Sequence, residues 1–414
     1  MSKQPEERKH PATGLATDDD FEPGFMLLFA VRLKAAFKGF AKLPEGVEAP
    51  DPVFSRSLLE RLHEVEARLL GEAFLKARRT ARWSLGRVTL DGLPGDAPRH
   101  ADVCLLAHKS GAALWEVWLA APAQPFDAAR WIGWLDAEAE DGLVARLRRA
   151  LAPINRDIAG EEKWAGLYFP LTVLRTPRDS LATLVGRHGP DLVRLLFRDR
   201  SSLPFKAELV TEELARDYGG HEGRLMLLAR RGALAAQGGD DTEEVAPPAG
   251  LPPRSALPFL VTLELLLLER AILQHLYERL AHRMPRSVDE LLALKEEVLD
   301  ALEEYYGAIT NATRFSDAVT ADGEVLLGLG DLYDAVRDRL DAVSFAITTR
   351  YQKRMTLLQF WLTVVFGATE IGFIASGIAT WYYRTGLGAV LAWTVGASLV
   401  SGLALVLLLR GKLE

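Results

Sequence analysis

The hydrophobic positions of this chain are most concentrated near its C-terminal end, in two long runs. Residues 355–383 contain one ionisable side chain, Glu370, and residues 389–409 contain none. Each run reaches the roughly 20 apolar residues that cross a bilayer core as a helix, in which every backbone polar group is bonded internally. The pattern predicts a two-helix transmembrane hairpin with an outer turn at residues 384–388. The alternative is a buried helical hairpin inside a large soluble core.

Basic residues flank these two runs unevenly. Arg350, Lys353 and Arg354 precede the first run, Arg410 and Lys412 follow the second, and only Arg384 lies in the turn. Because positive charges gather in cytoplasmic segments, we expect a multi-pass protein of the inner (plasma) membrane with both termini in the cytoplasm. Residues 410–414 would then be a short cytoplasmic tail.

The part before these runs is polar enough for a soluble body. Residues 1–21 are polar and lack the apolar core of a signal peptide, so we expect a disordered N-terminus. Residues 22–237 mix strand and helix patterns and predict an α/β or α+β cytoplasmic domain. Expected strands are Trp83–Leu90, Val103–His108, Ala113–Ala121 and Leu167–Leu174; expected helices are Ser57–Arg79 and Leu143–Leu151; Phe25–Phe37 fits a strand or a short helix, and Leu192–Phe197 and Arg224–Ala229 are further apolar segments.

A Pro-, Gly- and acid-rich stretch at residues 238–256 predicts a linker, and residues 257–354 predict an all-helical stalk. Leu257–Met284 is apolar nearly all round, Ser287 and Glu290 form a capping box, and residues 311–323 predict a polar turn. The last helix is expected to begin near Glu324 and to continue into the first membrane run over about 60 residues, or about 90 Å.

One side of this last helix carries an apolar seam with alternating spacings of four and three residues. The seam consists of Leu329, Tyr333, Val336, Leu340, Val343 and Ile347. Such a repeat is typical of a coiled coil and favours a homo-oligomer.

Composition and motifs narrow the function. The 414 residues have a net charge of −7 and no block of basic residues, which argues against direct nucleic-acid binding. The single cysteine, Cys104, fits a reducing compartment. Walker A, Gly-x-Gly-x-x-Gly and Gly-x-Ser-x-Gly motifs are missing and the histidines lack metal-ligand spacing, so we do not expect an enzyme.

The organisation of residues 255–414 resembles the CorA family of divalent-cation channels: a helical stalk continuing into the first span, a short outer turn, a second span and a basic tail. That family carries a Gly-Met-Asn signature at the outer end of the first span, and here Gly377, Ile378 and Ala379 occupy the corresponding place. The resemblance implies a funnel-shaped pentamer whose first span lines the pore, with Gly377, Ile378 and Ala379 among the pore-lining residues. Ala379 stands where the family has the asparagine credited with binding hydrated magnesium.

Glu370 is the most informative single residue, because a carboxylate at mid-membrane is costly unless it meets water, a partner or a proton. It shares one helical face with Thr363, Gly367, Ile374 and Gly377. In a ring of subunits this face would give a cation-selecting ring of carboxylates. The alternative is a protonated Glu370 that bonds to a Ser or Thr of a neighbouring span and serves only assembly.

Asp331, Asp334, Asp338 and Asp341 form an acidic row on the last helix. Oxygen-rich rows between subunits can hold magnesium or calcium, and the resemblance implies a gating role for such sites. The alternative is a solvated face balanced by neighbouring arginines. No resident cofactor is indicated beyond Mg²⁺ or another divalent cation.

A small-molecule site is suggested by two groups of residues in the soluble part. Trp115 and Trp118 could line a pocket for a nucleotide, although tryptophans at such positions also pack in cores, and Arg194 and Arg198 could meet phosphates. Three functions follow: a CorA-like cation channel, a membrane effector opened by a nucleotide-type messenger in bacterial antiviral defence, or a non-conducting membrane-anchored scaffold.

Overall fold

The computed structural model describes residues 20–34, 47–49, 58–69, 80–159, 167–176, 180–239, 252–282, 290, 292–296, 314–383 and 386–410. The chain divides into two compact units. The sheet unit comprises Met1–His282 and Lys295–Arg337, and the helical unit comprises Arg283–Leu294 and Asp338–Glu414.

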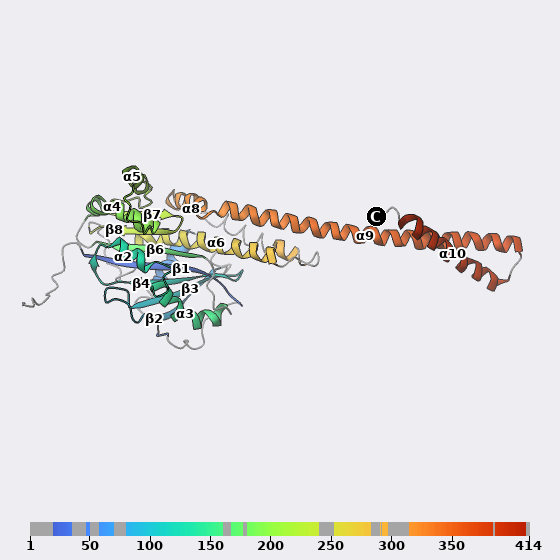
Figure 1. The fold of residues 1–414 in the computed structure, drawn as a ribbon, viewed down its shortest axis with the longest axis horizontal. Coiled ribbons are helices and arrows are strands. Elements are labelled where there is room, and N and C mark those ends of the chain that lie inside the picture. Colours follow the sequence, from blue (N-terminus) through green and yellow to red (C-terminus); the bar gives the residue numbers. More distant parts are fainter. Residues whose placement is uncertain are drawn as a thin grey trace, which may run out of the picture. The chain divides into compact units, whose positions relative to one another are not determined.

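The sheet unit is built on one mixed sheet with the strand order β2-β3-β4-β1-β6-β8-β7, and β5 pairs with the start of β1 (Figure 1). β6 and β8 run parallel, while the other neighbours are antiparallel. The strands are β1 (Asp20–Arg32), β2 (Thr80–Thr89), β3 (His100–His108), β4 (Ala112–Ala120), β5 (Gln124–Pro125), β6 (Tyr168–Arg175), β7 (Arg224–Ala229) and β8 (Gly232–Gln237).

An α/β sheet domain followed by helices is therefore confirmed. The β3–β4 hairpin forms where it was expected, and its turn uses Gly111 at φ +87°, a left-handed conformation that suits glycine. The segment that fitted either a strand or a helix is strand β1. β1 and β4 lie in the middle of the sheet, and their side chains are buried on both faces because helices cover both.

Helices cover the sheet in two layers. On one face, α2 (Ala128–Trp134), α3 (Leu143–Ala159) and α4 (Leu181–Phe197) enclose the main core with Phe25, Leu27 and Phe29 of β1. On the other face, α6 (Leu257–His282) contacts β4 and β1. Further helical segments are residues 58–69, α5 (Ala207–Ala215) and the 3₁₀ turn η1 (Arg254–Ala256).

Helix α4 was only partly anticipated, because Leu192–Phe197 was seen as an isolated apolar segment. The helix begins earlier, where the side chain of Ser180 accepts a hydrogen bond from the Thr183 N–H and caps the first turn. Gly186, Gly189 and Pro190 interrupt the apolar pattern inside it, which concealed the helix from a reading by periodicity.

Helix α6 lies in the sheet unit, whereas the sequence placed residues 257–354 in one stalk. Its predicted burial is correct, since Phe259, Leu260 and Leu263 are fully buried. The sheet buries an apolar helix that a stalk would leave exposed to water. The preceding predicted linker lies mostly outside the described residues.

The predicted turn at residues 311–323 is wrong over its described part, because α8 (Arg314–Leu327) is helical there. Gly323 does not mark a turn. A Cβ at that position would lie 2.5 Å from Leu266 Cδ1, so glycine lets α8 approach α6 closely. Helix α8 ends just before Gly328, which has a left-handed φ of +64°, and helix α9 (Leu329–Tyr383) begins at the next residue. The division between the two units falls inside α9, after Arg337.

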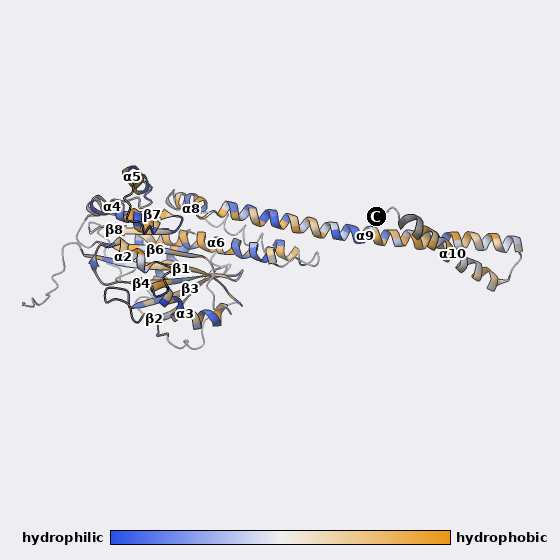
Figure 2. Ribbon diagram, viewed as in Figure 1, coloured by the Kyte–Doolittle hydropathy of each residue, from blue (hydrophilic) through white to orange (hydrophobic). Residues whose placement is uncertain are grey.

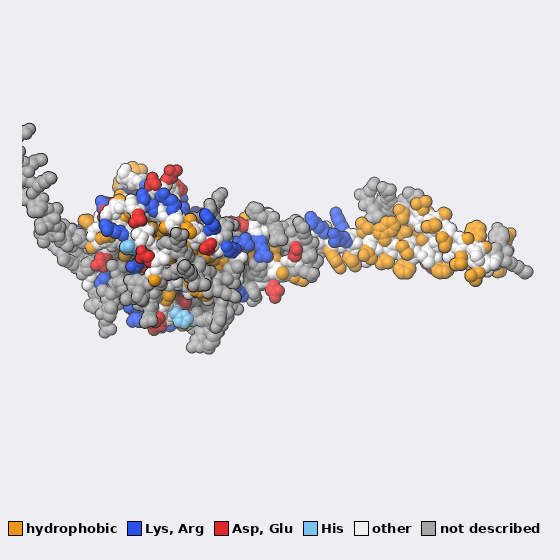
Figure 3. Space-filling model, turned by 90° about the horizontal axis from the view of Figure 1, so that it is seen from below, with side chains coloured by type: hydrophobic (Ala, Val, Ile, Leu, Met, Phe, Trp, Pro, Cys, Tyr) orange, Lys and Arg blue, Asp and Glu red, His pale blue; other side chains and the backbone are white. Residues whose placement is uncertain are grey.

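The helical unit contains two helices long and apolar enough to cross a membrane, namely the C-terminal part of α9 and α10 (Leu387–Arg410). Figure 2 shows the change from hydrophilic to hydrophobic residues along α9. Large apolar side chains such as Phe366 and Leu399, each 70% exposed, cover their surfaces, and Figure 3 shows Lys and Arg side chains where the apolar stretch of α9 begins. This exposure does not fit the alternative of a hairpin buried in a soluble core.

Candidate functional site

The two membrane-type helices contact one another along a face of small residues. A Cβ on Gly372 would collide with Ser398 Oγ and with the Thr394 carbonyl oxygen. Nearby, the Ser401 hydroxyl donates to the Ala368 carbonyl at 3.4 Å, and Gly402 lies against the Ala368 side chain. Small residues allow the helix backbones to approach closely. In a bilayer the hydrophobic effect does not drive helices together, so this close packing is what stabilises their association.

Glu370 lies on the opposite side of α9. Residues two positions apart differ by about 200° around a helix, so a side chain between Ala368 and Gly372 in sequence points away from α10. Glu370 is exposed, and it makes no hydrogen bond or ion pair with any residue that the structure describes. In the isolated chain, therefore, α10 does not satisfy this carboxylate.

Most of the predicted pore face accompanies Glu370. Thr363, Ile374, Gly377 and Ile378 are exposed, and Gly367 is half-buried near Leu405. The Thr363 hydroxyl donates to the Gln359 carbonyl of its own helix at 2.9 Å.

Ala379 does not belong to this face. It is 5% exposed and lies nine residues from Glu370, which places it about half a turn away, on the side of Ala368 and Gly372. Its assignment as a pore-lining residue is therefore wrong for the single chain. Gly377 and Ile378, the other two residues compared with the family signature, are exposed.

The acidic row on α9 is solvent-exposed at all four positions, Asp331, Asp334, Asp338 and Asp341. Within the described part of the chain, no three His, Cys, Asp or Glu side chains come together as a metal site. Val336, Val343 and Ile347 of the apolar seam are buried already in the single chain. An ion held between subunits by the row stays a prediction.

Trp115 and Trp118 lie in the core and do not line the cavity described below. They are 0% and 2% exposed, on opposite faces of the central strand β4, and the Trp115 indole N–H donates to Asn155 Oδ1 at 3.1 Å. The prediction that they bind a ligand is wrong, because helices cover β4 on both faces and both rings therefore pack in the hydrophobic core.

Arg194 is also committed elsewhere. Its guanidinium pairs with Asp191 at 3.0 Å, donates to the Leu203 carbonyl at 3.2 Å, and lies over the Phe205 ring. These contacts tie α4 to the segment that follows it. Arg194 therefore has a structural role and does not line the cavity described next.

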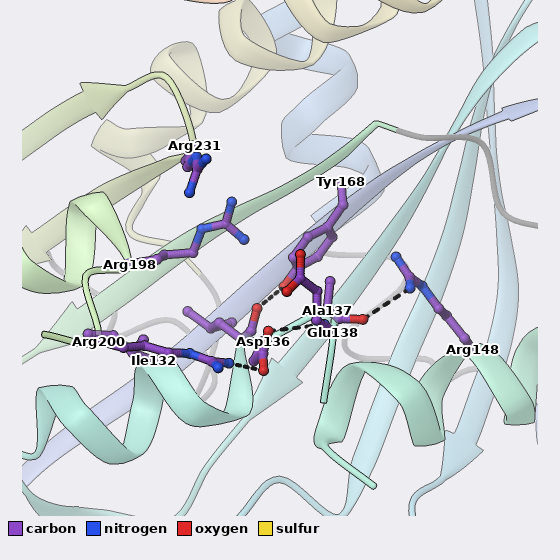
Figure 4. Close-up of a pocket in the computed structure, with 10 residues that line it drawn as sticks. Ile132, Asp136, Ala137, Glu138, Arg148, Tyr168, Arg198, Arg200 and Arg231 are labelled. Atoms are coloured by element: carbon purple, nitrogen blue, oxygen red, sulfur yellow. Dashed lines mark hydrogen bonds and ion pairs between the residues drawn. The ribbon is translucent and has the colours of Figure 1, made fainter. Parts of the chain in front are cut away.

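Arg198, by contrast, lines a pocket of about 600 Å³ in the sheet unit (Figure 4). The pocket lies between the loop after α2, helix α3, the start of β6, the end of α4 and the β7–β8 turn. Its lining residues are Ile132, Leu135, Asp136, Ala137, Glu138, Arg148, Tyr168, Arg198, Arg200 and Arg231. Four guanidinium groups therefore surround a space that contains two carboxylates.

Tyr168 is the fixed centre of this pocket. Its hydroxyl donates to the Leu135 carbonyl at 3.0 Å, and its ring stacks on Phe29 with centroids 5.0 Å apart. The guanidinium carbons of Arg198 and Arg148 lie 5.3 and 5.9 Å from the ring centroid. Figure 4 shows Tyr168 between these two arginines. Burial raises the pKa of the Tyr168 hydroxyl, so the ring stays neutral.

Burial lowers the pKa of both Arg148 and Arg198 from the usual value, and the nearby charge of Arg231 adds to the effect at Arg198. The sequence pointed to Arg198 but missed Tyr168, Arg148 and Arg231. Two consecutive arginines before Gly232 at a hairpin turn were the available signal, but only the tertiary fold brings that turn to the end of α4.

A second group of charges is buried between the sheet and α6. Arg82 pairs with Glu116, and its Nη2 donates to Glu66 at 2.8 Å and to Glu264 at 2.6 Å. Burial raises the pKa of both Glu116 and Glu264, against the influence of Arg82. The group is enclosed in the fold and connects β2, β4 and α6, which fits a structural role.

Comparison with family models, curated proteins and solved structures finds no match to this chain. Two features of the chain itself therefore point to its function: the position of Glu370 and the arginine-lined pocket.

Proposed function

We propose that this chain is a CorA-like oligomeric membrane channel for cations, in which α9 lines the pore. The α9–α10 hairpin would cross the plasma membrane twice with both termini in the cytoplasm, as the basic residues Arg350, Lys353 and Arg354 before the first span favour. The family resemblance suggests a pentamer.

The observation that carries this proposal is the position of Glu370. It is exposed on the side of α9 opposite Ala368 and Gly372, where α10 packs. A carboxylate that faces lipid costs several kcal/mol, so this face needs water or a second copy of the chain. If several subunits place this face around a common axis, Glu370 meets both neighbouring subunits and the water of a central pore. The Glu370 side chains then form a ring of carboxylates that favours cations.

The test is cation flux into liposomes that contain the purified full chain, measured for Mg²⁺, K⁺ and Na⁺ in parallel. We expect Glu370→Gln to reduce the preference for cations over anions severalfold, because it removes one negative charge per subunit from the pore. Thr369→Val is the matched control, since residue 369 lies one step around the helix and its hydroxyl bonds only to the Val365 carbonyl of the same helix.

Equal ion selectivity in wild type and Glu370→Gln would contradict the pore face. No flux in wild type under any of these ions, together with a monomeric mass in detergent, would favour the scaffold. A five-fold particle with Glu370 on its axis in single-particle images would support the proposal independently.

A second candidate, a membrane effector opened by a small molecule, is favoured by the arginine-lined pocket of the sheet unit. Under this function the wild-type protein would conduct only with its ligand bound. Flux measured with and without a bound anion separates the two candidates.

A further inference from the structure

The arginine-lined pocket has more positive charge than the described residues around it balance. Arg200 forms an ion pair with Asp136, and Glu138 is exposed at the rim. Arg148, Arg198 and Arg231 form no ion pair with a described carboxylate. Arg148 donates one hydrogen bond to the Ala137 carbonyl at 3.3 Å. The Nε atoms of Arg148 and Arg198 are buried without a hydrogen-bond partner among the described residues. Such groups are costly unless another molecule satisfies them.

Arg198 is also held in an unusual backbone conformation. Its φ of 54° and ψ of 40° are left-handed, and among the described residues no other non-glycine has a positive φ. Helix ends that need this conformation usually place glycine there, because a Cβ costs roughly 1 kcal/mol. An arginine at this position sends its side chain into the pocket, toward Tyr168 (Figure 4).

Closing the end of α4 does not require that side chain. The backbone N–H of Arg198 donates to the Leu195 carbonyl at 3.2 Å, and that of Asp199 donates to the Arg194 carbonyl at 3.0 Å. The carbonyls of Arg194 and Leu195 are met by the main chain. The guanidinium of Arg198 is therefore not needed to close the helix. It lies over Tyr168, bonds to its side chain, and lines the pocket.

The shape of the site limits what it can bind. The Tyr168 ring has Phe29 stacked at 5.0 Å and the two guanidinium groups of Arg148 and Arg198 close by, so it offers little open surface for a stacked base. The apolar lining is small and comes from Ile132, Leu135 and Ala137. A volume of about 600 Å³ exceeds that of one phosphate ion and lies within the range of small-molecule sites.

We propose that this pocket binds a compact small molecule with two or more phosphate groups, held by Arg198, Arg231 and Arg148. Planar guanidinium groups on both sides of Tyr168 can each donate two parallel hydrogen bonds to phosphate oxygens. Binding does not depend on whether the chain conducts ions. If the channel is ligand-operated, this molecule is the class of ligand that operates it.

The test uses pyrophosphate as the probe and isothermal titration calorimetry of the full chain in detergent, at fixed ionic strength and without divalent cations. We expect saturable binding of one pyrophosphate per chain. Arg231→Gln should weaken it at least about tenfold, the loss of one good charge-assisted contact. Arg230→Gln is the matched control, because it removes the same charge from the same turn but does not line the pocket. Binding should then stay within about twofold of wild type, since distant exposed charges are screened by salt.

Arg198→Gly separates binding from folding. Glycine adopts the left-handed conformation without strain, so the variant should melt no lower than wild type while it loses at least about tenfold in affinity. A lower melting temperature would give Arg198 a structural role and overturn the argument from its backbone. Absence of saturable binding, or equal losses in Arg230→Gln and Arg231→Gln, would overturn the site.

The phosphate groups could belong to a free metabolite or to a lipid headgroup. The same titration in nanodiscs of phosphatidylcholine, with and without cardiolipin, whose headgroup carries two phosphates, distinguishes them. Competition by cardiolipin that disappears in Arg231→Gln assigns the site to a headgroup, and unchanged pyrophosphate affinity assigns it to a soluble molecule.

Discussion

Two apolar helices of this chain each carry a carboxylate within their hydrophobic surface, and they satisfy it differently. On α6, Glu264 is 1% exposed and accepts a hydrogen bond from Arg82 at 2.6 Å. On α9, Glu370 is exposed and has no described partner. An apolar helix that is core to its own domain brings a counter-charge from the same chain, whereas one whose charge points outward relies on its surroundings.

Glu269, five residues further along α6, is an intermediate case. Burial, with a smaller contribution from the charge of Glu324 on α8, raises its pKa to about 7. With no cation close enough to outweigh its burial, this carboxyl keeps its proton up to near-neutral pH. The three acidic residues on apolar helices therefore differ: Glu264 is paired with an arginine, Glu269 keeps its proton, and Glu370 faces the surroundings of the chain.

The largest expected effect is the loss of the pairing partner. Arg82→Met would leave the buried Glu116 and Glu264 close to the part-buried Glu66 without a cation, and we expect a loss of about 3–5 kcal/mol in the free energy of unfolding. Thermal unfolding of the full chain in detergent measures it. Arg87→Met is the control, because its pair with Asp102 is partly exposed and should be worth about 1 kcal/mol or less. Similar losses in the two variants would show that the buried group is not what holds α6 to the sheet.

The protonated carboxyl predicts a pH dependence. The pKa of Glu269 is raised in the folded state, so its stabilising contribution is complete below the unfolded value of about 4.5 and is lost as the pH rises toward 7. The loss over this window is about 3 kcal/mol at most. Glu269→Gln should remove it and melt higher than wild type at pH 8. Melting curves from pH 5 to 8 measure this, and a wild-type slope that persists in the variant would contradict the assignment.

The α9–α10 contact uses close backbone approach and no ion pair among its described residues, so it should respond to volume instead of charge. Gly372→Ala would place a methyl group against Ser398 and Thr394 and should destabilise the helical unit by about 1–3 kcal/mol. Gly377→Ala meets nothing within 4 Å in the single chain and should leave its melting temperature unchanged. If both variants melt alike, the two helices do not pack through Gly372.

The sequence predicted what depends on local pattern and missed what depends on tertiary contact. Residues 355–383 and 389–409 were recognisable because apolar length alone marks a membrane-type helix, and α9 and α10 cover them. The sequence placed α6 in the stalk because a predicted linker precedes it. Its packing on β4 and β1, and the pairing of Glu264 with Arg82 of β2, show that it belongs to the sheet unit.

The candidate sites follow the same division. The exposure of Glu370 was predictable from helical spacing, but Ala379 was misassigned by analogy with a linear motif. Trp115 and Trp118 suggested a pocket by composition, although a central strand buries both of its faces. The arginine-lined pocket brings together residues 136, 148, 168, 198 and 231 from five elements, and their spacing along the chain does not predict that they lie close together.

The smallest expected effect concerns the stability of Glu370→Gln, and it separates the two roles left open for this residue. If Glu370 faces a water-filled pore, its charge is solvated, and the substitution should change the free energy of unfolding by less than about 1 kcal/mol while it changes ion selectivity. If it is a protonated group that bonds to a neighbouring subunit, the glutamine alters that bond. The oligomer should then dissociate at a different detergent concentration, with no flux to lose. Native mass spectrometry across a detergent series, run beside the flux assay, measures both quantities on the same variant. An unchanged oligomer with altered selectivity supports the pore, and an altered oligomer without flux places Glu370 in an assembly contact.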